Sequence, residues 1–103
     1  NTGTATDTNY LTQAPRLDFR VNFKATGTHY VWIRGWGISG NDDSCHVGLD
    51  GAAVTTADRI QGFTNGWTWT RATADGPNAT LNIASTGIKT VNLWMREDGL
   101  IVD

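Results

Sequence analysis

The sequence predicts an all-β protein that folds as an antiparallel β-sandwich, and three observations predict this class. Threonine is abundant and tryptophan is 5 of 103 residues, whereas glutamate, lysine and leucine are scarce. This composition favours strands and disfavours helices. Several short segments alternate apolar and polar residues, and glycine-containing turn signals separate them. We therefore expect about seven short antiparallel strands in two packed sheets.

Length and charge set the domain organisation and exclude some partners. A chain of 103 residues can form one domain, which we assign to residues 17–103 after an irregular polar lead-in at 1–16. Eight basic residues against ten acidic ones give a net charge of −2 with no basic stripe, which argues against a nucleic-acid partner. No apolar run approaches the roughly 18 residues of a membrane span.

The first expected strand is the segment LDFRVNFKA, residues 17–25. Its apolar and polar residues alternate strictly, as in a half-buried strand. A turn at 25–28 follows, in which Gly27 is free to adopt a positive φ. The expected core-facing residues are Leu17, Phe19, Val21 and Phe23.

The segment from Tyr30 to Gly37 is the second expected strand. Val31 and Ile33 fall on the inner face. The outer face then carries Tyr30, Trp32, Arg34 and Trp36.

The segment SCHVGLDG, residues 44–51, is the third expected strand and ends in an Asp50-Gly51 turn. Its inner residues are Cys45, Val47 and Leu49, and Ser44 and His46 point outward. A single cysteine cannot form an intrachain disulfide, so we interpret Cys45 as a buried thiol.

The remaining strands lie in the second half of the chain. WTWT, residues 67–70, places Trp67 and Trp69 on one face. ATLNIA, residues 79–84, directs Leu81 and Ile83 inward, and LIV, residues 100–102, is a short last strand. KTVNLWMR, residues 89–96, directs its aliphatic residues inward and its other residues outward. The outward residues of this segment are Asn92, Trp94 and Arg96.

Two of these strands place tryptophan and arginine on the same outer face, as Trp32-x-Arg34 and Trp94-x-Arg96. An exposed aromatic face forgoes the stabilisation of burial, roughly 1.5–3 kcal/mol for each side chain, so it suggests a binding partner. The alternative is that Trp32 and Trp94 are covered on both sides and that arginine stacks on tryptophan only for packing.

A sugar is the partner that these side chains fit best. Aromatic rings pack on the apolar faces of a pyranose, and arginine, aspartate and asparagine bind its hydroxyl rim. We expect these groups near the strand ends and loops, with Glu97 beside them. The candidate ligand-binding residues are Arg34, Trp36, Asn41, Asp42, Asp43, Asn65, Trp67, Trp69, Trp94, Arg96 and Asp98.

Catalysis and metal binding have weaker signals. Ser44 and His46 share a face but lack the context of a nucleophile elbow. The carboxylate pairs at 42–43 and 97–98 lie in loops, and a small sandwich seldom places two carboxyls across a cleft. No EF-hand loop or zinc spacing is present, so a structural Ca²⁺ stays open without a motif and no cofactor is predicted.

The order of several segments resembles carbohydrate-binding modules of the galactose-binding-like jelly-roll type, families 6 and 35 and their malectin-like relatives. The segments are GTHYVWIRGWG, VGLDG, NGWTWT and LNIASTGIKTVNLWMREDGLIVD. Trp67 matches the Trp of the family's Gly-Trp segment, and Trp36 lies near the loop that supplies the second clamping aromatic. The closing segment has Ile101 where the family often has Asn, and no Glu-x-Glu calcium motif precedes Leu17.

The resemblance implies a bacterial, secreted, non-catalytic module that tethers a glycoside hydrolase or polysaccharide lyase to its polysaccharide. It also implies a main site in the loops at one edge and a second option on the concave face, through Trp32, Arg34, Trp94 and Arg96. Two alternatives stay open: a structural or adhesion module without a sugar site, and a small hydrolase that uses Ser44.

Overall fold

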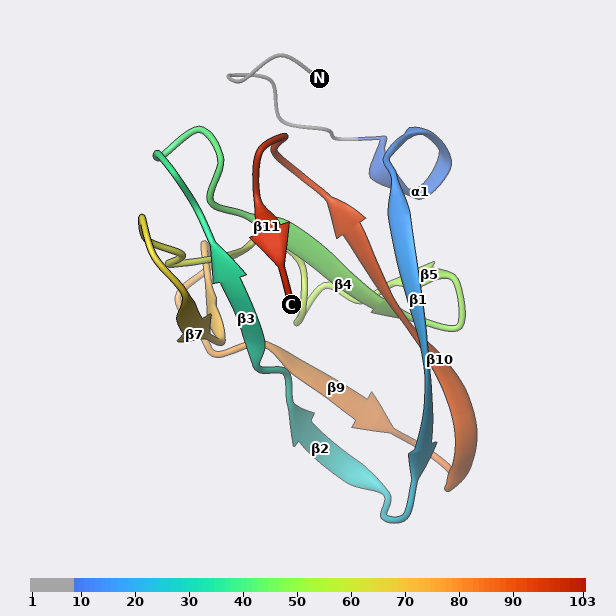
Figure 1. Ribbon diagram of the computed structural model, residues 1–103. Helices are drawn as coiled ribbons and strands as arrows, with labels where there is room; N and C mark the ends of the chain where they lie inside the picture. Colours follow the sequence, from blue (N-terminus) through green and yellow to red (C-terminus); the bar gives the residue numbers. More distant parts are fainter. Residues whose placement is uncertain (1–8) are drawn as a thin grey trace.

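The computed structural model describes residues 9–103, and these form an antiparallel β-sandwich with one short helix (Figure 1). The predicted all-β sandwich is therefore confirmed. Helix α1 and the two-residue strands β5, β6 and β8 are not predicted by the sequence pattern. The elements are α1 (Tyr10–Gln13), β1 (Arg16–Phe23), β2 (Gly27–Tyr30), β3 (Ile33–Trp36), β4 (Cys45–Leu49), β5 (Ala52–Ala53), β6 (Ile60–Gln61), β7 (Thr68–Thr70), β8 (Ala72–Thr73), β9 (Thr80–Ile83), β10 (Gly87–Met95) and β11 (Ile101–Val102).

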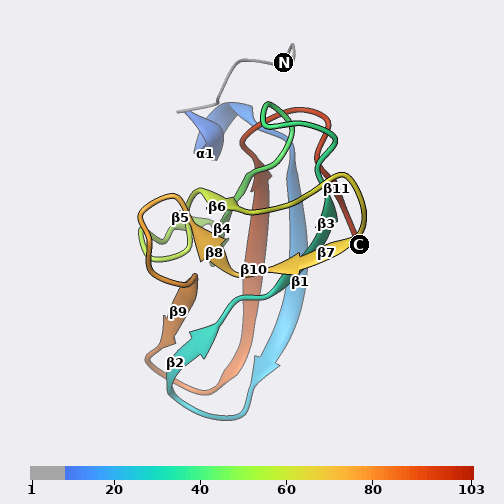
Figure 2. The same cartoon turned by 90° about the vertical axis from the view of Figure 1, so that its left-hand side faces the viewer.

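The strands form two main sheets and one ribbon. The largest sheet has the order β1-β10-β4-β6-β8, with β5 paired to β4, and the second has the order β11-β3-β7. β2 and β9 pair separately, and Figure 2 shows this ribbon beside the lower ends of β1 and β10. Every pairing between these strands is antiparallel, and the separate sheets allow β3 and β4 to pack their inner residues against each other.

The prediction of a single strand from Tyr30 to Gly37 is wrong, because this segment is divided between β2 and β3. β2 ends at Tyr30 and pairs with β9, whereas β3 begins at Ile33 and pairs with β7 and β11. Between them, the Val31 amide donates to the carbonyl of Ala79 at 2.9 Å. The chain thus passes from the ribbon to the second sheet within two residues, and Trp32 stands at this crossing.

The core lies between the sheets and contains the inner residues of β3, β4 and β9. Val47, Leu81 and Ile83 are buried as predicted. Cys45 is a free cysteine with no exposed surface, which confirms the prediction of a buried thiol. The other buried apolar residues are Phe23, Ile33, Ala57, Ile60, Phe63 and Ala79.

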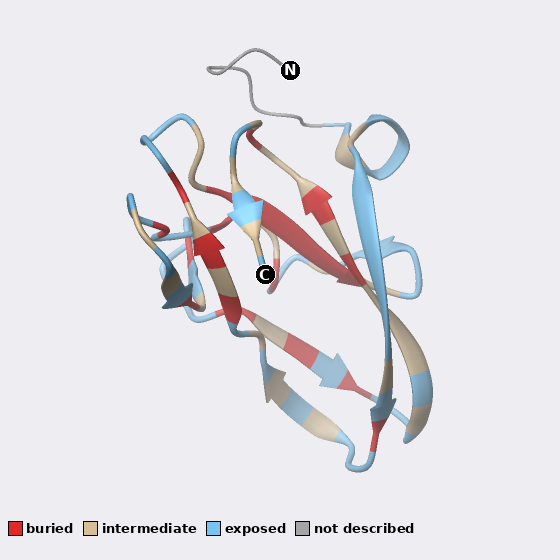
Figure 3. Cartoon of the chain, viewed as in Figure 1, coloured by how far each residue is buried: buried red, intermediate tan, exposed pale blue. Residues whose placement is uncertain are grey.

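The apolar face of β1 is not buried, which corrects the prediction for its first half. Leu17 is 48% exposed and Phe19 is 50% exposed, and β1 is pale over most of its length in Figure 3. A groove of about 710 Å³ lies beside these residues, and residues of β3 and β11 line its other side. The groove and the exposure of Leu17 and Phe19 show that the second sheet does not cover this part of β1.

The opposite face of β10 is covered, so the expected exposure of Trp94 is wrong. Trp94 is 1% exposed, and its ring lies over Gly48, where an added Cβ would come within 2.6 Å of the ring. Asn92, also predicted to point outward, is 1% exposed and donates to Asp18 at 2.7 Å. The side chains of β10 alternate between its two faces as predicted. The face that carries Asn92 and Trp94, which was expected to be exposed, is the buried one because other parts of the chain pack over it.

The N-terminal segment provides part of that cover, which corrects the prediction of an irregular lead-in for residues 9–16. Tyr10 stacks on His46, with ring centroids 3.9 Å apart, and contacts Trp94 edge-on at 5.3 Å. His46 and Ser44, predicted to point outward, are buried as a result of packing on this side and in the adjoining loop. Residues 1–8 of the predicted lead-in lie outside the described residues.

Two predicted turns have the backbone geometry that their residues favour. Asp50 and Gly51 have φ values of 51° and 81°, and Gly27 has a φ of 100°. These positions fix the reversals after β4 and before β2. Within residues 9–103, no helix has both the length and the hydrophobicity needed to cross a membrane.

Candidate functional site

The paired strands β3 and β7 place a row of aromatic and arginine side chains on their outer face. Arg34 pairs with Trp69, while Ile33, the neighbour of Arg34, is buried in the core. Because alternate residues share a face, the same register places Trp36 opposite Trp67 and Trp32 opposite Arg71. We name this row the tryptophan–arginine ladder. It consists of Trp32, Arg34, Trp36, Trp67, Trp69 and Arg71.

At one end of the ladder, four of the predicted site residues meet. The indole N–H of Trp36 donates to Asn65 Oδ1 at 2.8 Å, and the ring of Trp36 meets Trp67 edge-on with centroids 5.8 Å apart. The guanidinium of Arg34 lies 4.3 Å from the centroid of the Trp67 ring and also pairs with Asp103. These contacts hold the two indoles at a fixed angle, with hydrogen-bonding groups beside them.

At the other end, Arg71 is held between two rings. Its guanidinium carbon lies 4.6 Å from the centroid of Trp32 and 4.7 Å from that of Tyr30. Arg71 and Tyr30 are not among the predicted site residues. A signal was present, because Trp67-x-Trp69-x-Arg71 repeats the alternation of Trp32-x-Arg34-x-Trp36 on the strand that pairs with it.

Three of the four rings of the ladder are open to solvent, and the fourth, Trp36, is half-buried. Trp32 is 51% exposed, Trp67 is 43% exposed and Trp69 is 61% exposed. Two strand positions separate successive rungs, so the ladder is about 13 Å long at roughly 3.3 Å per residue. A contiguous exposed aromatic strip of this kind is typical of a binding surface, because aromatic rings that stay in solvent do not stabilise the fold by burial.

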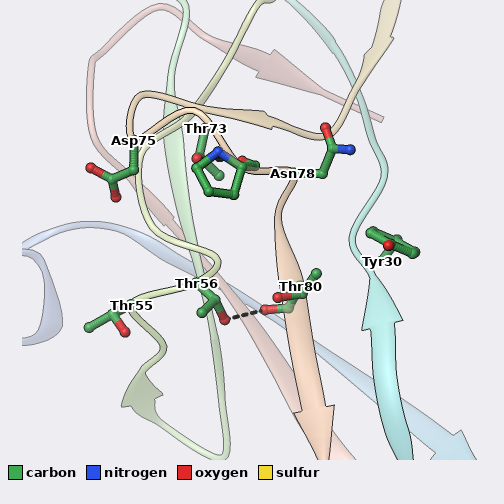
Figure 4. Close-up of a pocket in the computed structure, with 8 residues that line it drawn as sticks. Tyr30, Thr55, Thr56, Thr73, Asp75, Asn78 and Thr80 are labelled. Carbon is green, nitrogen blue, oxygen red and sulfur yellow. Dashed lines mark hydrogen bonds between the residues drawn. The ribbon is translucent and has the colours of Figure 1, made fainter.

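A hydroxyl-rich pocket adjoins the Tyr30 end of the ladder (Figure 4). Its volume is about 320 Å³, and the Tyr30 ring at its rim also contacts Arg71. Inside it, Thr56 donates to the carbonyl of Thr80 at 2.8 Å. The pocket is lined by Tyr30, Thr55, Thr56, Thr73, Asp75, Pro77, Asn78 and Thr80.

The predicted loop residues form a different cluster, in which the carboxylates already contact other groups of the protein. Ser39 donates to Asp42 Oδ2 at 2.7 Å, and the same Asp42 carboxylate lies so close to Gly99 that an added Cβ would come within 2.6 Å of it. Asn41 is exposed, and its backbone amide donates to Ser39 Oγ at 3.2 Å. Asp98 is half-buried in the facing loop. These residues tie the loop after β3 to the loop after β10.

A buried network continues from this cluster. The Ser44 hydroxyl donates to Glu97 Oε2 at 2.6 Å and accepts from Arg96 Nη1 at 2.8 Å. Burial raises the pKa of Asp43, and so do a side-chain hydrogen bond with Glu97 and the charge of Glu97. Ser44 has no exposed surface, so its hydroxyl is inaccessible to a substrate in this conformation.

The predicted site residues therefore separate into three groups. Arg34, Trp36, Asn65, Trp67 and Trp69 come together at the ladder. The loop group ties two loops together, and Trp94 is buried beneath Tyr10. The predicted concave-face site of Trp32, Arg34, Trp94 and Arg96 is thus wrong, because Trp94 is sealed on another sheet. Across residues 9–103, no three His, Cys, Asp or Glu side chains are grouped so that they could hold a metal ion.

Comparison with known proteins finds one relevant similarity. The chain is 32% identical over 97 residues to the uncharacterized protein P23 of Formosa agariphila. The match covers 84% of this chain and 23% of that protein, so the chain spans about a quarter of the length of the relative. No family model matches the chain, and no solved structure matches it.

Proposed function

We propose that this chain is a non-catalytic carbohydrate-binding domain and that the tryptophan–arginine ladder is its ligand platform. The single observation that carries the proposal is the exposed ladder itself, in which three tryptophans with at least 43% exposure lie on one face of a two-strand scaffold. Indole faces complement the apolar C–H faces of pyranose rings. The arginine and asparagine groups beside them can bind the hydroxyl rim.

The shape of the surface favours a linear glycan over a single sugar. The ladder extends over about 13 Å along the strands, and the hydroxyl-rich pocket follows at its Tyr30 end. A polymer lying along this track contacts several rings at once. We expect affinities in the millimolar to micromolar range, about −4 to −8 kcal/mol.

The proposed biological role is tethering. A domain of this size attached to a secreted polysaccharide-degrading enzyme raises the local concentration of that enzyme on the polymer. The similarity to part of a longer protein supports a place within a multidomain chain.

Affinity gel electrophoresis with a panel of soluble neutral and acidic polysaccharides tests the proposal, followed by isothermal titration calorimetry with each polymer that retards the domain. Trp67→Ala removes one ring of the platform. The lost stacking is worth roughly 1–2 kcal/mol, so the affinity should fall about 5- to 30-fold. Ile88→Ala is the matched control, because Ile88 is also an exposed apolar residue, 60% accessible, but it lies on β10 outside the ladder.

Two results decide against the proposal. If no polymer in the panel retards the wild-type domain, the ladder is not a glycan platform and the structural or adhesion alternative is favoured. If Ile88→Ala weakens binding as much as Trp67→Ala while both variants stay folded by circular dichroism, the glycan binds elsewhere.

A further inference from the structure

Arg71 differs from the other arginines of the protein in what surrounds its guanidinium group. Its guanidinium carbon lies over two aromatic rings, 4.7 Å from the centroid of Tyr30 and 4.6 Å from that of Trp32. Two cation–π contacts therefore restrict the position of the guanidinium group, and Arg71 is half-buried. A cation–π contact does not use up the N–H donors of the guanidinium, so these donors can still bind an acceptor.

Those edge donors have no acceptor among the residues that the structure describes. No carboxylate of residues 9–103 lies within ion-pair distance of Arg71, and no side-chain hydrogen bond is made by its guanidinium. Most other arginines are bonded to protein groups. These pairs are Arg16 with Asp18, Arg34 with Asp103, Arg59 with Asp75, and Arg96 with Ser44 and Glu97.

We propose that Arg71, clamped by Tyr30 and Trp32, is an oxyanion subsite, and that the glycan bound by this domain carries carboxylate or sulfate groups. A guanidinium edge matches a carboxylate or a sulfate with two parallel charge-assisted hydrogen bonds. The ring clamp fixes the orientation of the group in advance, so little side-chain freedom is lost on binding. The inference rests on the proposed carbohydrate function, and it specifies the charge of the ligand.

The position of Arg71 fits an acidic group on a sugar ring. Tyr30 is shared between the arginine clamp and the hydroxyl-rich pocket, where Thr56, Thr80 and Asn78 offer hydroxyl and amide groups. A sugar at this pocket can direct its anionic substituent to Arg71 while its hydroxyls meet the pocket. The net charge of −2 makes indiscriminate attraction of polyanions unfavourable, so binding of an acidic polymer depends on this local site.

The test compares acidic polymers with their neutral counterparts by affinity electrophoresis and calorimetry. Polygalacturonate against its methyl ester probes carboxylate, and a sulfated galactan against the desulfated polymer probes sulfate. Arg71→Gln removes both the positive charge and the planar set of guanidinium N–H donors. Arg71→Lys keeps the charge but lacks that planar set of donors. Arg20→Gln is the matched control, because Arg20 is an exposed arginine on β1 that loses the same unit of charge.

We expect the wild type to prefer at least one acidic polymer over its neutral form, which identifies carboxylate or sulfate as the source of the anion. Arg71→Gln should weaken binding of that polymer roughly 10- to 100-fold, with Arg71→Lys between it and the wild type. Arg20→Gln should bind like the wild type. Competition by free galacturonate or inorganic sulfate against the wild type gives the same information without a variant, should Arg71→Gln fold poorly.

The possible failures are distinguishable. Equal binding of acidic and neutral polymers, unaffected by Arg71→Gln, overturns the oxyanion subsite and leaves the glycan function standing. Binding of no polymer overturns both proposals. An equal loss in Arg20→Gln shows general electrostatics and overturns the subsite, as does an equal, Arg71-dependent affinity for single-stranded oligothymidine, which stacks on aromatics and carries phosphate.

Discussion

Replacing each of two tryptophans by alanine tests the assignment of the two strand faces. Trp94 and Trp69 are both predicted ligand-binding residues, but Trp94 is 1% exposed and Trp69 is 61% exposed. Trp94→Ala removes a fully buried ring that packs on Gly48, Tyr10 and Arg16. The expected cost is about 3–5 kcal/mol, from lost burial and the cavity that remains. Trp69→Ala should change the free energy of unfolding by no more than about 0.5 kcal/mol, as an exposed substitution does.

Urea unfolding followed by far-UV circular dichroism measures both effects without relying on tryptophan fluorescence. With a slope of about 1–3 kcal/mol/M, a loss of 3–5 kcal/mol shifts the midpoint by more than about 1 M. A domain with a total stability of 5–15 kcal/mol would then be marginal, so Trp94→Ala is best studied at low temperature or in stabilising osmolyte. The reasoning is refuted if Trp94→Ala costs less than about 1 kcal/mol, or if Trp69→Ala costs more than about 2 kcal/mol.

Two further predictions concern titratable groups. Burial raises the pKa of Cys45 to about 12, so native protein at pH 8 should react with a thiol reagent only as fast as it unfolds, and rapid modification of native protein would contradict this. The pKa of Asp43 is raised, so the folded state binds the proton more tightly than the unfolded state, and stability falls as the pH rises from the ordinary value of 3.8 through the raised one. Asp43→Asn removes this loss, and its unfolding free energy relative to wild type should therefore be higher at pH 7 than at pH 4; an unchanged difference would refute the assignment.

Much of the candidate site could be predicted because alternation along a strand is a local property. The pattern of the segment from Tyr30 to Gly37 places Trp32, Arg34 and Trp36 on one face whatever the rest of the chain does. The same holds for Trp67 and Trp69. What sequence could not supply is the register, since the pairing of Arg34 with Trp69 brings together residues that are 35 positions apart. The alternation along the strand puts Arg71 on the same face as Trp67 and Trp69, and the register then places it opposite Trp32.

The sequence by itself determined the strand class, the tight turns at Gly27 and Asp50-Gly51, and which side chains share a face, because these follow from backbone geometry over a few residues. The tertiary structure decided which face is buried. Leu17 and Trp94 each lie on the strand face that the alternation predicts. Leu17 nevertheless lies beside an open groove, and Trp94 is buried beneath Tyr10. Burial depends on what packs over a face, and distant parts of the chain supply that cover.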